Sequence, residues 1–213
     1  MAQKPPKDRG PLVLLLAAAA VLLAALALWL YLTNQEPGEG SAEAGFARDM
    51  SVHHAQAVEM AEIVRDKTQS DEIRLMAADI ALTQQGQIGR MQGWLDAWNL
   101  PATGTEPAMS WMGHPMEGRM PGMASPEEIE RLQNAQPAEA ARIFLQLMVP
   151  HHQAAVPMAE AVMERTDRPE VENLAGAIAA TQKAEIRTMK EMLEERGSRA
   201  PSGPQGHGGM HSH

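Results

Sequence analysis

The first strongly apolar stretch of the chain is Pro11–Leu32, which contains no charged residue. A helix of about 22 residues is roughly 33 Å long, enough to cross a bilayer. Basic residues precede it, so we expect residues 1–10 to stay in the cytoplasm. Leu28-Trp29-Leu30 is too bulky for a signal-peptide cleavage site. The pattern therefore favours an uncleaved single-pass transmembrane helix over secretion after signal cleavage. Either alternative places the rest of the chain outside the cytoplasm.

After a tether at residues 33–42, apolar positions recur every three to four residues, which is typical of amphipathic helices. The first predicted helix, residues 43–67, has an apolar stripe formed by Phe46, Met50, His53, Ala57, Met60 and Val64. The second, residues 71–98, has a stripe formed by Ile73, Met76, Ala77, Ile80, Gln84, Ile88, Met91 and Leu95. Ser70 is a suitable N-cap, and the connection is short, so the two helices are expected to form an antiparallel hairpin.

The second half of the chain repeats this plan. Ser125-Pro126-Glu127-Glu128 is a capping box that predicts a short helix ending near Ala135. A longer helix is predicted over residues 137–166, and a last one that ends near Arg196, before Gly197. We therefore predict an all-α fold in which two helical hairpins make a four-helix bundle. The predicted parts are a cytoplasmic N-terminus (1–10), transmembrane anchor (11–32), tether (33–42), first hairpin (43–98), crossover loop (99–124), short helix with second hairpin (125–197) and flexible His/Met tail (198–213).

Two prolines interrupt the second predicted hairpin. Pro150 directly precedes His151, and Pro157 follows within the same predicted helix. An interior proline removes a backbone hydrogen bond and costs about 3 kcal/mol. Two alternatives are open: a helix loosened beside His151, or a helix that begins near Pro150 after a shorter one.

A shift of 98 residues lays residues 46–95 on residues 144–193 without a gap. The identical pairs include Met50/Met148, His53/His151, His54/His152, Val58/Val156, Met60/Met158, Glu62/Glu160, Thr83/Thr181, Gln84/Gln182, Ile88/Ile186 and Met91/Met189. Such a repeat indicates one supersecondary unit used twice around one core. Adjacent imidazoles and several thioethers return at fixed offsets, in addition to the apolar pattern.

Composition narrows the candidate chemistry. The formal net charge is −9, which argues against nucleic acid as a partner and suits soluble cations. The absence of cysteine excludes disulfides, zinc thiolates, iron–sulfur clusters and a c-type haem attachment motif. Sixteen methionines stand against two phenylalanines and one tyrosine, a bias that packing alone explains only in the helices.

The repeated histidines and methionines are candidate metal ligands. In an antiparallel hairpin that turns near residue 69, Gln84 lies opposite His53, and Met91 lies within a turn of Met50. One hairpin can therefore gather Met50, His53, Gln84 and Met91, with His54 nearby, and the other can gather Met148, His151, Gln182 and Met189, with His152 nearby. Imidazole with thioether favours Cu(I) over zinc, iron or manganese, and Ag(I) is its mimic. The alternative is that ancestral duplication preserved purely structural pairs.

The crossover loop contains a second group of candidate ligands, Met109, Met112, His114, Met116, Met120 and Met123. The segment is too rich in glycine and proline to form a core of its own. We expect an exposed cluster that binds Cu(I) or Ag(I) weakly and exchangeably. The alternative is a loop folded back over the bundle. The tail carries His207, Met210, His211 and His213, which could recruit Cu(II).

Two motifs resemble a known family. His-His-x-x-x-Val-x-Met-Ala-Glu occurs as His53–Glu62 and His151–Glu160, and Gln-x-x-[Gln/Glu]-Ile-x-x-Met as Gln84–Met91 and Gln182–Met189. Over about residues 44–197 the chain is similar to the bacterial domain-of-unknown-function family 305. The resemblance implies a ferritin-like four-helix bundle in the cell envelope, and the family includes copper-resistance protein M-like members that bind copper. It implies ligand roles for His53, His54, Met60, Met91, His151, His152, Met158 and Met189. Val52, Glu59 and Gln87 differ from Pro150, Pro157 and Glu185 at the repeated positions, so the two sites are expected to differ in affinity.

The leading hypothesis is a membrane-tethered, extracytoplasmic copper-binding protein that sequesters Cu(I) or exchanges it with a donor or acceptor protein in the envelope. A haem-binding bundle with His/Met ligation is one alternative, and a metal-free envelope interaction module is another. A ferritin-type di-iron site needs Glu-x-x-His, which is absent from the repeats. No nucleophile–base set is present, so we do not expect an enzyme.

Overall fold

The computed structural model describes residues 10–33 and 35–198. The chain separates into two units, residues 1–37 and residues 38–213. In the first unit, α1 (Gly10–Thr33) contains an 18-residue window, Val13–Leu30, with a mean hydropathy of 2.8 and no buried residue. The predicted apolar helix is therefore confirmed. Its length and composition suit either a signal sequence or an anchor.

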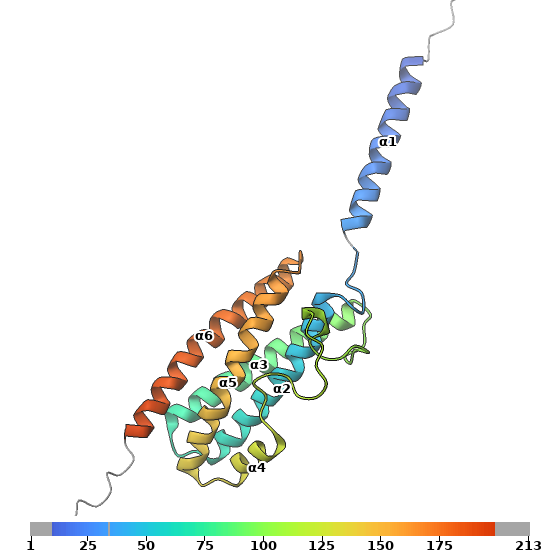
Figure 1. The fold of residues 1–213 in the computed structure, drawn as a ribbon. Coiled ribbons are helices and arrows are strands. Elements are labelled where there is room, and N and C mark those ends of the chain that lie inside the picture. The colour runs from blue at the N-terminus through green and yellow to red at the C-terminus, as the bar shows by residue number, and fades with distance from the viewer. Residues whose placement is uncertain (1–9, 34, 199–213) are drawn as a thin grey trace, which may run out of the picture. The chain divides into compact units, whose positions relative to one another are not determined.

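The second unit is all-helical, as predicted (Figure 1). Its elements are α2 (Ala42–Lys67), α3 (Asp71–Ala97), the 3-10 turn η1 (Ser110–Met112), α4 (Pro126–Asn134), α5 (Pro137–Met163) and α6 (Pro169–Ser198). α2 packs against α3, α5 packs against α6, and the two hairpins meet through α2 and α5. The short helix α4 packs against both α2 and α5. The described residues contain no strand, only one isolated bridge pair in the crossover.

Side-chain caps define where three of the helices begin. The hydroxyl of Ser41 accepts from the Ala44 N–H, and that of Ser70 accepts from the Ile73 N–H. At α4 the predicted capping box is present in both directions, since Ser125 N–H donates to Glu128 and Glu128 N–H donates to Ser125. Each cap satisfies a backbone donor that the first turn of a helix leaves unpaired.

Small residues lie where the two hairpins meet. Ala57 and Ala61 of α2 correspond in the repeat to Ala155 and Ala159 of α5. All four are buried. Ala57 and Ala155 lie three to four residues after the histidine pair of their helix, and Ala61 and Ala159 lie one turn further on. Side chains of this size let helices approach closely, so the two histidine pairs are brought together at the centre of the unit.

Helix α5 continues through both prolines, so the alternative of a helix that begins near Pro150 is wrong. Pro150 and Pro157 both lie on the exposed side of the helix. The rest of α5 is buried along most of its length. We attribute the continuity to this packing, which offsets the lost backbone hydrogen bonds.

The crossover folds back onto the bundle, which corrects the expectation of an exposed methionine cluster. Asp49 of α2 holds it in place, since one carboxylate oxygen accepts from the Met109 N–H and from the Trp111 indole N–H, both at 2.8 Å. The Trp111 ring lies so close to Gly45 that a Cβ there would overlap it. Met109 and Met120 are consequently buried.

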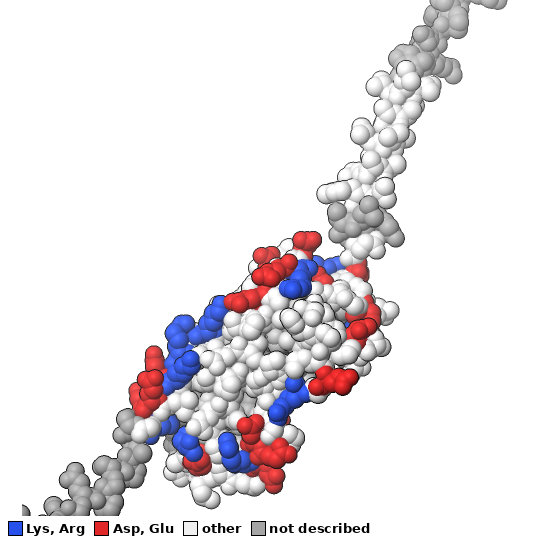
Figure 2. All heavy atoms as spheres, in the orientation of Figure 1, with Lys and Arg blue, Asp and Glu red and all other residues white. Residues whose placement is uncertain are grey.

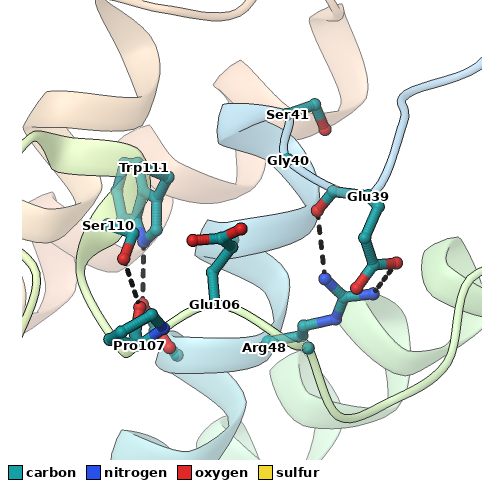
Figure 3. Close-up of a pocket in the computed structure, with 11 residues that line it drawn as sticks. Glu39, Gly40, Ser41, Arg48, Glu106, Pro107, Ser110 and Trp111 are labelled. Carbon is teal, nitrogen blue, oxygen red and sulfur yellow. Dashed lines mark hydrogen bonds and ion pairs between the residues drawn. The ribbon is translucent and has the colours of Figure 1, made fainter. Parts of the chain in front are cut away.

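A surface cavity of about 310 Å³ separates the crossover from the start of α2 (Figure 3). The Arg48 guanidinium on its wall pairs with Glu39 at 2.9 Å and donates to the Pro101 carbonyl at 3.0 Å. Glu106 also lines it. These contacts tie the chain before α2 to the crossover. On the face shown in Figure 2, acidic and basic side chains are interspersed around an uncharged middle.

Candidate metal centre

Four histidines meet where α2 crosses α5, and none of them is exposed to solvent: His53, His54, His151 and His152. The rings of His53 and His151, which are equivalent in the repeat, lie 3.8 Å apart between centroids and are tilted by 37°. The centroids of His151 and His152 are 6.2 Å apart. The duplication therefore brings the two predicted histidine pairs into a single centre that both hairpins share.

Most polar atoms of this centre have no hydrogen-bond partner. His53 Nε2 bonds to the Pro121 carbonyl at 3.2 Å, and His152 Nε2 bonds to Glu185 at 2.8 Å. Its unpartnered buried atoms are His53 Nδ1, His152 Nδ1 and both ring nitrogens of His54 and His151, and both side-chain amide atoms of Gln84 on α3 and Gln182 on α6 are buried and unpartnered as well. Each such group costs roughly 1–3 kcal/mol, and native structures contain few of them. Their concentration here indicates a site built to meet a ligand.

Burial keeps three histidines of this centre neutral, namely His53, His54 and His151. Desolvation lowers the pKa of His53 to about 4, although the Pro121 carbonyl opposes the shift. The pKa of His54 is lowered to about 3 by desolvation and by the neighbouring His53. The pKa of His151 also lies well below 6.5, because of desolvation and because of the neighbouring histidines. A neutral imidazole has a free lone pair, which is the form that coordinates a metal ion.

The six helical candidate methionines are all buried, but they do not group by hairpin. Met50 and Met91 lie in one apolar cluster together with Met158, whereas Met148 and Met189 lie in the other together with Met60. Each cluster thus takes two thioethers from one hairpin and the third from the other. The predicted association of Met50 with Met91, and of Met148 with Met189, is therefore present, and the second motif methionine, Met60 or Met158, lies in the cluster of the other hairpin.

The segment Met120–Ala124 covers the His53 side of the centre. Pro121 supplies the carbonyl bound by His53, and the Gln56 side chain bonds to both the N–H and the carbonyl of Ala124. Gly122 has a φ of 75°, and a Cβ there would collide with the Pro150 carbonyl and the Ala154 side chain. The backbone of this segment therefore packs so closely against α5 that only glycine fits at position 122.

The loop ligands predicted from the sequence occupy different environments. Met109 and Met120 join the cluster of Met50, Met91 and Met158. Met112, Met116 and Met123 are half-buried against the same cluster, and His114 is exposed. The loop methionines thus lie beside the thioethers of the helices, and their ligand roles stay predictions. The predicted tail ligands lie outside the described residues.

Although the four histidines are neighbours, no three His, Asp or Glu side chains within residues 10–33 and 35–198 are placed to hold one metal ion. Nitrogen and carboxylate ligands alone therefore do not make a ready site in this arrangement. The donors predicted from the sequence are imidazole nitrogens, thioether sulfurs and amide oxygens. This mixed set suits a soft, low-coordinate ion better than zinc or magnesium.

Sequence reasoning located the histidines, the glutamines and the methionines, but it missed three groups around them. These are the Pro121 carbonyl, the Gln56 side chain that holds Ala124, and the bond between His152 and Glu185. The last had a signal in the sequence, since Glu185 and Gln87 occupy equivalent positions of the repeat and differ in charge. The first two depend on where the crossover folds, which local sequence does not encode.

The second unit is thus an all-helical protein in which two sequence repeats meet at a buried group of histidines. Residues 43–193 match the family model described as "Domain of unknown function (DUF305)", and the chain belongs to this family. No curated protein is detectably similar to it.

Solved structures support the same assignment. A protein from Streptomyces coelicolor, described as a secreted DUF305 protein, is 48% identical with a TM-score of 0.72, and the match covers 75% of this chain and 96% of that one. A DUF305 fragment from Deinococcus radiodurans is 36% identical with a TM-score of 0.60, covering 72% and 96%. CopM in its Cu(I)-bound form is 29% identical with a TM-score of 0.55, again covering 72% and 96%. CopM is also known in Cu(II)-bound and silver-bound forms.

Proposed function

We propose that this chain is a membrane-anchored, extracytoplasmic copper-binding protein with a ferritin-like bundle. It would sequester Cu(I) or exchange it with a donor or acceptor protein in the envelope, with no enzymatic role. The observation that carries the proposal is the group of buried histidines with unpartnered nitrogens in a core that also contains two buried methionine clusters. The similarity to CopM, which binds copper and silver, points to the same ions.

The residues present fit a soft monovalent ion. His53, His54, His151 and His152 supply buried imidazole nitrogens, and Met50, Met60, Met91, Met148, Met158 and Met189 supply buried thioethers within the same core. The half-buried loop methionines beside one cluster are suited to receive the ion at the surface. Haem is a poorer fit, because a ring separation of 3.8 Å between His53 and His151 leaves no space for a porphyrin between them.

Silver should raise the melting temperature of residues 38–198, a chain that contains the whole bundle but neither anchor nor tail. A ligand that binds only the folded state adds about 2.7 kcal/mol at a hundredfold excess over Kd. Replacing His53 and His151 together by alanine should remove most of the shift and leave the helical circular dichroism intact. The matched control is His114→Ala, because His114 is exposed on the loop and should leave most of the shift in place.

Zinc and Fe(II) should raise the melting temperature much less than Ag(I) or Cu(I) does, since thioethers are poor ligands for them. If Ag(I) and Cu(I) leave the melting temperature of this chain unchanged, the histidine centre is structural and the proposal is wrong.

The anchor is the second part of the proposal. With α1 uncleaved, the full-length chain should sediment with membranes, and its N-terminal sequence should begin before residue 10. The basis is the uncharged window Val13–Leu30, which is long enough to span a bilayer. Residues 38–213 expressed alone should stay in the supernatant. An N-terminus that begins after residue 30 would instead establish cleavage and secretion.

A further inference from the structure

The two halves of the histidine centre differ in charge. In the second half, a carboxylate oxygen of Glu185 lies 2.8 Å from His152 Nε2, and the side chains are 14% and 0% exposed. In the first half, the equivalent positions are Gln87 and His54. Gln87 lies near His54, but neither ring nitrogen of His54 forms a hydrogen bond of ordinary geometry. The two repeats therefore share their histidines but differ in the side chain next to the second histidine, which is Gln87 in the first repeat and Glu185 in the second.

The Glu185 contact determines which nitrogen of His152 is free. A carboxylate oxygen at this distance accepts a hydrogen bond from an imidazole N–H, which places the proton of the neutral ring on Nε2. The lone pair is then on Nδ1, which is buried and has no partner. A carboxylate behind a ligating imidazole orients the ring and makes the opposite nitrogen a stronger donor. The Glu185 contact thus orients His152 so that its Nδ1 can bind a metal ion, whereas no carboxylate orients His54 in this way.

The charge of Glu185 is also available to a bound ion. Within residues 35–198, no lysine or arginine forms an ion pair with it, and His152 is the group it contacts. The nearby Lys183 pairs instead with Glu160, at 2.6 Å on the surface. A nearly buried negative charge favours a divalent over a monovalent ion, because the Coulomb attraction scales with the charge of the ion.

We propose that Glu185 makes the His152 half of the centre selective for Cu(II), while the neutral half around His54 and Gln87 takes monovalent Cu(I) or Ag(I). The inference rests on the proposed copper-binding function and adds a division of labour between the repeats. Glu185 acts through His152 and through its charge, as a positioning residue. The chain would then hold copper in both oxidation states, each in a different half of one centre.

The repeat supplies its own matched variants. Four full-length proteins are compared: the natural chain, Glu185→Gln, Gln87→Glu, and the exchange that combines both. Glu185→Gln keeps the shape and an acceptor oxygen but removes the charge. The tail is the same in all four, so it contributes equally to each titration. Dissociation constants for Cu(II) and Ag(I) are measured by competition with a chelator, and the nitrogen couplings of bound Cu(II) by electron paramagnetic resonance.

Glu185→Gln should weaken Cu(II) binding roughly 10–100-fold, the usual effect of losing a group behind a metal ligand. Ag(I) affinity should change by less than about threefold, since a monovalent soft ion depends on thioethers. Gln87→Glu should strengthen Cu(II) binding, and the exchange should restore the Cu(II) affinity and nitrogen couplings of the natural chain.

Equal weakening of Cu(II) and Ag(I) by Glu185→Gln would overturn the inference, as would unchanged Cu(II) binding or failure of the exchange to restore it. These outcomes leave the proposed function standing, because Ag(I) still binds the natural chain. If neither ion binds the natural chain, the proposed function fails together with the inference. Urea unfolding of the metal-free variants checks that the fold itself is unchanged.

Discussion

Lowering the pH from 7.5 to 5.0 should destabilise the metal-free bundle by about 2 kcal/mol for each buried histidine that stays neutral, or about 6 kcal/mol for three of them. The three are His53, His54 and His151, whose pKa values all lie below the ordinary 6.5. Between pH 6.5 and about 4, the unfolded chain binds protons at these histidines and the folded protein does not. Stability is therefore present above pH 6.5 and falls as the pH decreases.

Urea unfolding of residues 38–198 at the two pH values measures this effect. His114→Ala serves as the matched control, because this histidine is exposed and its removal should leave the pH dependence unchanged. Asp49 acts in the opposite direction, since burial raises its pKa above 3.8. Because the folded Asp49 carboxyl binds its proton more readily than the unfolded one, it offsets part of the destabilisation caused by the histidines. Equal stability at pH 7.5 and pH 5.0 would contradict the burial of neutral histidines.

The sequence predicted the helices well because their signals are local. The N-caps at Ser70 and Ser125 and the three-to-four-residue period placed the helical segments within a few residues of their observed bounds. The repeat predicted that two hairpins would be built alike. It also identified His53 and His151 as equivalent, so a pseudo-symmetric contact between them follows once the hairpins pack face to face.

The arrangement between the hairpins was harder to predict. Periodicity shows that Met60 faces inward, but the register of α2 against α5 decides which methionines it joins. That register depends on long-range packing of alanines such as Ala57 and Ala155, which carry no local signal. The crossover was misjudged for the same reason. Its glycines and prolines excluded helix, but the contacts that bury Met109 and Met120 come from distant residues.

Replacing Gln84 and Gln182 together by leucine should stabilise the metal-free bundle by about 1–3 kcal/mol at each position. Both side chains are 2% exposed, and no amide atom of either has a hydrogen-bond partner. Leucine has a similar volume and no polar atom, so the desolvation penalty disappears without a large cavity. Urea unfolding at pH 7.5 measures the gain. Gln85→Leu is the matched control, because Gln85 is the exposed neighbour and its substitution should be nearly neutral.

The same double substitution should reduce the Ag(I)-induced rise in melting temperature, since it removes two oxygen donors from the centre. Greater stability with weaker metal binding is the pattern expected when a protein keeps unfavourable polar groups for function. A loss of stability in the metal-free protein would show that these amides are bonded in the folded state. A gain in stability with undiminished Ag(I) binding would exclude them as ligands and leave the histidines and thioethers as the donors.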